Sequence, residues 1–210
     1  MSRRALVRLQ REIGVCTRCV DAGYIERANP IFHGTTTARL MVVGQAPGPT
    51  AAKRPLPYSG PSGRTLRSWL SEAGFPDDAL YDPERFYLTS VTKCFPGRSR
   101  SGNGDRAPGR AEMTLCRPHL EGELALVRPE LILALGRISI ETFLPSLRGA
   151  ALREIIGVPR SVERTPAKGT RVLPLPHPSG VSRWHNDSEN RVRLRAALAW
   201  LANAREEHGW

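Results

Sequence analysis

Long apolar runs are missing from this sequence of 210 residues. The longest runs, residues 40–43 and 131–135, are far shorter than the roughly 20 residues that a membrane-spanning helix requires, which excludes an integral membrane protein. The basic N-terminal segment also lacks the apolar region of a secretory signal. We therefore expect a cytoplasmic chain that makes no membrane contact.

Acidic residues are scarce relative to basic ones. The chain has 20 Asp and Glu against 31 Lys and Arg, which gives a formal net charge of +11, so an acidic partner such as nucleic acid is favoured. The sequence also lacks a repeat with a period of roughly 20–50 residues, and its hydrophobic content of 40% suffices for one core. We expect a single domain over residues 1–210 and, because no oligomerisation motif is visible, a monomer.

Short β-prone runs alternate with amphipathic segments along the chain. We predict strands at residues 39–43, 86–91, 131–135 and 172–175, and helices at residues 2–13, 63–73, 112–127, 138–144 and 189–204. This alternation implies a three-layer α/β/α fold with a central, mainly parallel four-stranded sheet. Because ligands bind at the carboxyl ends of such strands, the loops at residues 44–48, 90–109 and 177–186 should converge on one site.

Four cysteines are present, and in a reducing compartment they are better interpreted as ligands or buried hydrophobes than as two disulfides. Cys16 and Cys19 form a C-x-x-C pair, Cys94 follows the second predicted strand, and Cys116 lies on a predicted helix. A tetra-thiolate site suits a [4Fe–4S] cluster or a tetrahedral Zn²⁺ ion, and the residues alone leave both open. Either group would fasten the N-terminal segment to the loop after the second strand.

Four motifs, in a consistent order, resemble those of the uracil-DNA glycosylase superfamily. They are GQAPG at residues 44–48, YSG at 58–60, YLTSVTKC at 87–94 and HPSGVS at 177–182. The four cysteines resemble those of its iron–sulfur branches, called families 4 and 5. The resemblance implies cleavage of the N-glycosidic bond of a deaminated base in DNA, and a [4Fe–4S] cluster in place of zinc.

The resemblance also implies roles for individual residues. His177 would donate a hydrogen bond to a carbonyl oxygen of the leaving base, and Gln45 would orient the attacking water. The base pocket would consist of Gly44, Ala46, Pro47, Gly48, Tyr58 and Ser90. Val181 would act as a wedge in the vacated base stack, and contacts to phosphates and bases would come from Ser179, Arg183 and Trp184.

The turn at residues 44–48 departs from the family pattern, because it contains no acid. Family 4 has Glu where Gln45 stands, and family 1 has Asp where Ala46 stands. A neutral Gln can align a water molecule but cannot accept its proton. Asp105, in the Gly-rich loop after the second predicted strand, is the candidate replacement.

Ser90 stands where many relatives have an Asn that reads the edge of uracil. A hydroxyl cannot supply the paired donor and acceptor of an amide, so we predict relaxed specificity that extends to hypoxanthine or xanthine. The Arg-, Gly- and Ser-rich insert at residues 97–110 lengthens the spacing between Cys94 and Cys116 and is a candidate DNA contact.

Three functions are compatible with these features. The first is a monofunctional DNA glycosylase of base excision repair, which acts on DNA containing deaminated bases and is found with the nucleoid. The second is a non-catalytic lesion- or nucleic-acid-binding protein that keeps the fold and the cluster. The third, a zinc-containing nucleotide hydrolase, is disfavoured by the strong basicity and by the absence of a paired-carboxylate metal motif.

Overall fold

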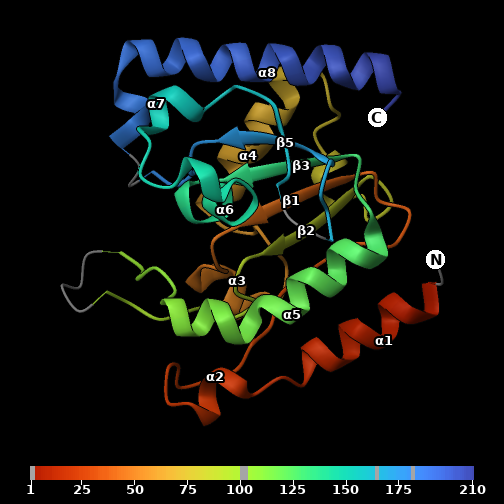
Figure 1. Cartoon of the computed structure of the whole chain (residues 1–210), viewed down its shortest axis with the longest axis vertical. Helices are drawn as coiled ribbons and strands as arrows, with labels where there is room; N and C mark the ends of the chain where they lie inside the picture. The colour runs from red at the N-terminus through yellow and green to blue at the C-terminus, as the bar shows by residue number, and fades with distance from the viewer. Residues whose placement is uncertain (1–2, 100–103, 164–165, 181–182) are drawn as a thin grey trace.

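The centre of the computed structural model is a twisted sheet of five strands in the order β2-β1-β3-β5-β4 (Figure 1). The structure describes residues 3–99, 104–163, 166–180 and 183–210. Four strands run parallel, and they match the four predicted ones: β1 (Leu40–Gly44), β2 (Phe86–Ser90), β3 (Leu131–Leu135) and β5 (Arg171–Leu175).

The prediction of a four-stranded sheet was wrong by one short strand. β4 (Arg160–Ser161) has two residues and pairs antiparallel with β5, where Arg160 lies opposite Val172. A two-residue strand shows no alternation of apolar and polar residues, so its sequence carries no periodic pattern. β4 lies at the edge of the sheet, next to β5 and away from β1.

Helices cover both faces of the sheet, as the three-layer prediction requires (Figure 1). On one face, the strands pack against α4 (Pro61–Glu72) and α8 (Ser188–His208). On the other face they pack against α1 (Arg3–Gly14), α5 (Arg110–Val127) and α6 (Arg137–Phe143). The shorter helices are α2 (Arg18–Asp21), α3 (Pro49–Lys53), α7 (Leu152–Ile155), η1 (Ala79–Tyr81), η2 (Pro145–Leu147) and η3 (Arg183–Asn186).

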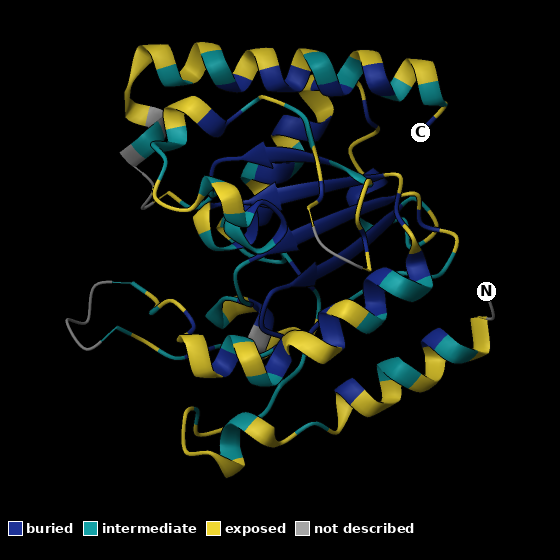
Figure 2. Ribbon diagram, viewed as in Figure 1, coloured by how far each residue is buried: buried dark blue, intermediate teal, exposed yellow. Residues whose placement is uncertain are grey.

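The main strands are buried on both faces, which explains their continuous apolar sequences (Figure 2). Along β1, Leu40 and Val42 contribute to the core beneath α4 and α8, whereas Met41 and Val43 contribute to the core beneath α5 and α6. Among the described helices, none is long and apolar enough to span a membrane.

An ion pair is buried where the chain leaves β2. Lys93 Nζ lies 2.8 Å from Glu123 Oε2, and the two side chains are 1% and 0% exposed. The ammonium also donates to Thr89 Oγ1 at 2.8 Å and to the carbonyl of Ser90 at 2.6 Å. Glu123 accepts further hydrogen bonds from the hydroxyls of Tyr87 and Thr89. Because buried charges persist only when they are paired and hydrogen-bonded, this network fixes the end of β2 against α5.

We predict that Glu123→Leu strongly destabilises the protein, because it leaves the Lys93 ammonium buried without its carboxylate. The free energy of unfolding, measured by urea denaturation, should fall by about 3–5 kcal/mol. Adding Lys93→Met should recover part of this loss, and a double variant as unstable as the sum of the single ones would contradict the pairing. As a control, Glu189→Gln removes an exposed ion pair with Arg193 and should cost less than about 1 kcal/mol.

Candidate active site and cysteine cavity

A pocket of about 630 Å³ opens at the carboxyl ends of the parallel strands, within the size range of small-ligand sites. Residues of all three loops predicted to converge line it, including Gln45, Ser90, Asp105 and His177. After β1 the chain passes to α4 on one face of the sheet, and after β3 it passes to α6 on the other. Loops that diverge in this way between neighbouring strands leave a crevice at the strand ends.

His177 follows β5, and its hydrogen bonds define which ring nitrogen carries the proton. The backbone N–H of Ser179 donates to His177 Nδ1 at 3.2 Å, and the Ser179 hydroxyl lies 2.8 Å from the same nitrogen. An amide N–H can only donate, so Nδ1 is the acceptor, and a neutral imidazole then carries its proton on Nε2. His177 is therefore arranged as an Nε2–H donor on the wall of the pocket.

Gly136 lies directly against His177 and was not predicted as a site residue. It directly follows β3 with a φ of +80°, and a Cβ atom at this position would lie 3.2 Å from His177 Cβ and 3.3 Å from its Cδ2. Both the backbone conformation and the close approach favour glycine. The glycine after a buried strand was visible in the sequence, but its contact with His177 depends on β3 and β5 being neighbours.

The turn after β1 is attached to the chain that follows β2. Gly44 pairs with Ser90 in the sheet, and the carbonyls of Gly44 and Gln45 accept hydrogen bonds from the backbone of Val91 and Thr92. The pocket residues predicted in this region, Gly44, Gln45, Ala46, Pro47, Gly48 and Ser90, all line the cavity. The structure therefore brings these residues together, and their roles remain predictions.

Tyr58 enters the pocket with an unusual backbone conformation. Its φ of +56° is rare for a residue with a side chain, and its carbonyl accepts a hydrogen bond from the Tyr81 hydroxyl at 2.8 Å. A Cβ atom at Gly63 would lie 1.5 Å from this carbonyl oxygen, so the first turn of α4 requires glycine there. These two contacts fix the backbone from which the Tyr58 ring extends.

Asp105 reaches the pocket from a hairpin. Arg98 and Asp105 form an antiparallel bridge and an ion pair with a 3.3 Å N–O distance, and the amide of Arg106 donates to the carbonyl of Gly97. A Cβ atom at Gly48 would lie 3.9 Å from Asp105 Oδ2. The Asp105 carboxylate is therefore close to the acid-free turn at residues 44–48, as it must be to replace the missing acid.

The residues predicted to contact DNA are placed less uniformly. Ser179 lines the pocket, but its hydroxyl contacts His177. Trp184 is half-buried in η3 and packs against the hydrophobic core, and Arg183 begins the same short helix. Val181 lies outside the described residues, so its role as a wedge stays a prediction.

The four cysteines converge on a second, smaller cavity between α2, α5 and the end of β2. It is lined by Cys16, Cys19, Cys94 and Cys116, together with other residues such as Lys93, Glu112 and His119. The backbone N–H of Lys93 donates to Cys116 Sγ at 3.2 Å. Burial, reinforced by the neighbouring thiols, raises the pKa of Cys19 to about 11, and burial raises the pKa of Cys94 to the same value. A ligand that needs thiolates would therefore have to displace protons here.

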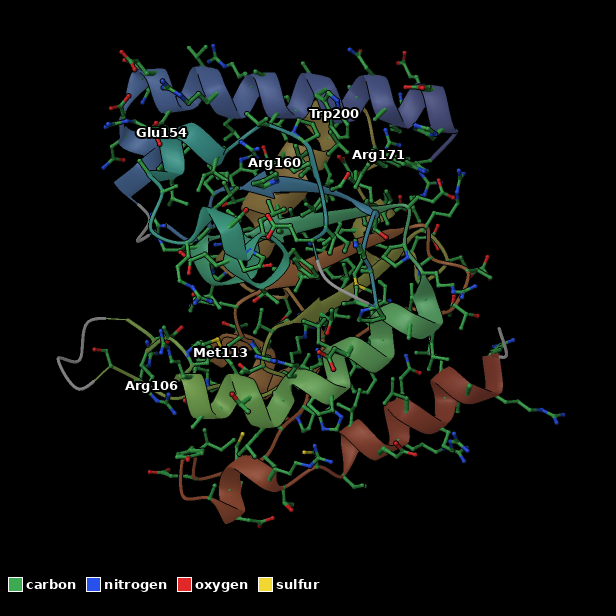
Figure 3. The ribbon with its side chains drawn as sticks, viewed as in Figure 1. Arg106, Met113, Glu154, Arg160, Arg171 and Trp200 are labelled. Carbon is green, nitrogen blue, oxygen red and sulfur yellow. The ribbon has the colours of Figure 1, made fainter. Side chains whose placement is uncertain are left out.

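Arg106 connects the hairpin to the wall of the cysteine cavity. Its guanidinium donates to both oxygens of Glu112, at 2.6 and 2.8 Å, and to the carbonyl of Tyr24 at 2.8 Å. In Figure 3 it lies beside the N-terminal end of α5, near Met113. Burial alone would raise the pKa of Glu112, but the hydrogen bonds from Arg106 and Gly109 outweigh this effect and hold that pKa below its usual value.

Comparison with known proteins agrees with these features. The model of the uracil DNA glycosylase superfamily matches residues 31–202. A type-4 uracil-DNA glycosylase of Thermotoga maritima is 26% identical over 180 residues, which cover 85% of this chain and 84% of the relative. Its counterpart in Pyrobaculum aerophilum is 30% identical over 139 residues, 66% of this chain and 64% of the relative. That in Sulfurisphaera tokodaii is 29% identical over 136 residues, 64% of this chain and 56% of the relative.

The chain thus spans less than two thirds of the length of two of these relatives. The family match includes the turn after β1, Ser90, His177 and two of the cysteines, Cys94 and Cys116, and it begins after Cys16 and Cys19. It covers most of the chain and confirms the resemblance drawn from the motifs: this chain belongs to the uracil-DNA glycosylase superfamily.

Proposed function

We propose that this chain is a monofunctional DNA glycosylase that hydrolyses the N-glycosidic bond of uracil or another deaminated base in DNA. The observation that carries the proposal is the fixed Nε2–H donor of His177 on the pocket wall, set by the hydrogen bonds that its Nδ1 accepts from Ser179. As the bond breaks, negative charge develops on a carbonyl oxygen of the base. A preorganised donor stabilises that charge more than it stabilises the neutral substrate.

Water attack takes place on the sugar side of the pocket. Gln45 aligns the water through its amide, while Asp105, close to Gly48, supplies the carboxylate that the turn lacks. A carboxylate can accept the proton of the water and can also stabilise the positive charge that grows on the sugar. The ion pair with Arg98 holds Asp105 on the hairpin but leaves its second oxygen facing the turn.

A [4Fe–4S] cluster fits the cysteine cavity better than a zinc ion does. Among the described residues, no three His, Cys, Asp or Glu side chains are grouped closely enough to hold one metal ion, although four cysteines line the same cavity. Ligands of a single zinc lie within about 2.3 Å of it, whereas the four thiolates of a cubane cluster bind different irons and stand further apart. When bound, the cluster would fasten α2 to α5 and to the end of β2.

DNA is the partner that the charge and the family both favour. A net charge of +11 supports binding to phosphates that is independent of sequence, and the substrate base must leave the duplex stack to enter the pocket. Ser90 at the floor of the pocket supports relaxed specificity, because its single hydroxyl reads a base edge less strictly than an amide. Such a protein would be found with the nucleoid.

We predict that His177→Ala lowers the rate of base release from uracil-containing oligonucleotides by about 10²–10³-fold. Ser179→Ala should lower this rate much less, because the backbone N–H of residue 179 still donates to His177 Nδ1. Base release is measured as alkali-labile strand cleavage under single-turnover conditions, with uracil and hypoxanthine in single- and double-stranded DNA. An unchanged rate in His177→Ala would contradict the proposal. A wild-type chain that binds lesions but releases no base would support the non-catalytic alternative.

We predict that the anaerobically purified chain contains iron and acid-labile sulfide in equal amounts, with broad visible absorbance. Cys94→Ser should lose both and melt at a lower temperature, because one bond between the N-terminal segment and the sheet is gone. Thr17→Ala, which removes an exposed hydrogen bond to Asp21 beside the same cavity, is the control and should keep its iron. Stoichiometric zinc in the wild type would overturn the cluster assignment.

We predict that Asp105→Asn lowers single-turnover base release by about 100-fold, the lower range of a lost general base. Arg98→Gln removes the ion pair but keeps the carboxylate, so its effect should be small by comparison. If Asp105→Asn releases base at the wild-type rate, Asp105 has no role in water activation.

A further inference from the structure

The hydroxyl of Tyr58 is fully buried, and it has no hydrogen-bond partner among the described residues. Tyr58 nevertheless lines the candidate active-site pocket. The neighbouring Ser59 Oγ, in the same pocket, is also buried without a partner. Buried polar atoms are nearly always hydrogen-bonded, so two unpartnered hydroxyls on one pocket wall indicate that the pocket receives a polar ligand.

The Tyr58 hydroxyl is held in this position by the backbone. Residue 58 has a φ of +56°, its carbonyl is bonded to Tyr81, and the contact of this carbonyl with Gly63 leaves no room for adjustment. Such a conformation costs free energy in a residue with a side chain. The backbone from which the ring extends is therefore fixed at the start of α4.

The hydroxyl lies directly over the last residue of β1. A Cβ atom at Gly44 would lie 2.7 Å from the phenol oxygen and 3.6 Å from Cζ. Gly44 pairs with Ser90 in the sheet, so the Tyr58 hydroxyl and the Ser90 side chain belong to the same part of the pocket floor. Burial also raises the pKa of Tyr58 well above its usual value. The phenol therefore stays protonated and can donate its O–H at any working pH.

We propose that the Tyr58 hydroxyl donates a hydrogen bond to a carbonyl oxygen of the extruded base and thereby determines which bases the pocket selects. The inference rests on the proposed glycosylase function and adds a specificity determinant to it. It goes beyond the place in the base pocket that the family resemblance implies for Tyr58, because it assigns a role to the hydroxyl itself. Deamination converts an exocyclic amino group into a carbonyl oxygen, so a fixed O–H donor favours uracil over cytosine and hypoxanthine over adenine.

The first test is Tyr58→Phe, which keeps the ring and removes only the hydroxyl. We expect kcat/KM for the preferred deaminated base to fall by about 3- to 10-fold, the effect of one lost hydrogen bond between neutral groups. The melting temperature of the free protein should stay the same or rise, because the variant no longer buries an unpaired polar atom. Higher stability together with lower activity is a pattern that a merely structural hydroxyl does not produce.

Tyr87→Phe is the matched control. The Tyr87 hydroxyl is also buried, but it donates to Glu123 at 3.1 Å and does not line the pocket. This variant should lower the melting temperature and leave the preference among bases unchanged. Tyr58→Phe should therefore change selectivity without loss of stability, whereas Tyr87→Phe should lower stability without a change in selectivity.

A double-mutant cycle with Gly44→Ala tests the position of the hydroxyl. In the wild-type background the new methyl group would clash with the phenol oxygen, whereas in the Tyr58→Phe background it would meet only the ring edge at an ordinary contact distance. Gly44→Ala should therefore reduce kcat/KM by a larger factor in the wild-type background than in the Tyr58→Phe background. Equal factors would mean that the hydroxyl does not lie over Gly44 during the reaction, which contradicts the position on which the proposal rests.

Selectivity is also measured by binding, as the ratio of Kd values for undamaged and uracil- or hypoxanthine-containing DNA. An unchanged ratio in Tyr58→Phe, or a lower melting temperature of that variant, overturns the proposal. These outcomes differ from failure of the proposed function, in which the wild-type chain releases no base. In that case the Kd ratio still reports whether the hydroxyl contributes to recognition of the lesion.

Discussion

The buried ion pair between Lys93 and Glu123 is the constraint on which the rest of the site depends. The Lys93 ammonium donates a hydrogen bond to the carbonyl of Ser90, which lines the active-site pocket, and the Lys93 amide donates to Cys116 Sγ in the cysteine cavity. Its carbonyl in turn accepts a hydrogen bond from the backbone of Ile31. The short segment between β2 and Cys94 therefore contributes to both cavities, and its hydrogen bonds tie the position of one to the position of the other.

The sequence predicted the architecture well because the features that specify it are local. Continuous apolar runs mark strands that are buried on both faces, and amphipathic periodicity marks the helices between them. Once the strands are parallel, the loops at their carboxyl ends must meet, so Gln45, Ser90 and His177 lie around one pocket. The approach of Asp105 to Gly48 was also predictable in outline, because the hairpin leaves the sheet at this same edge.

What the sequence could not predict depends on contacts between distant residues. Lys93 would ordinarily be assigned to the surface, and its burial follows from Glu123, thirty positions later on α5. Gly136 resembles any glycine after a strand until β5 brings His177 against it. The contact between the Ser179 hydroxyl and His177 was not predicted, and the contact of Ser179 with phosphate stays a prediction. In each case the pairing of side chains follows from tertiary structure and not from spacing along the chain.

The acid-free turn and the long insert before Cys116 can be understood together. A carboxylate within the turn after β1 would be held rigidly by the sheet. Here the nearest candidate lies on a hairpin, whose position depends on the bidentate pair between Arg106 and Glu112 at the start of α5. Glu112 also lines the cysteine cavity. If Asp105 acts as proposed, the placement of the catalytic carboxylate therefore depends on the cavity proposed to hold the cluster, which gives that cavity a role in catalysis without any contact with the substrate.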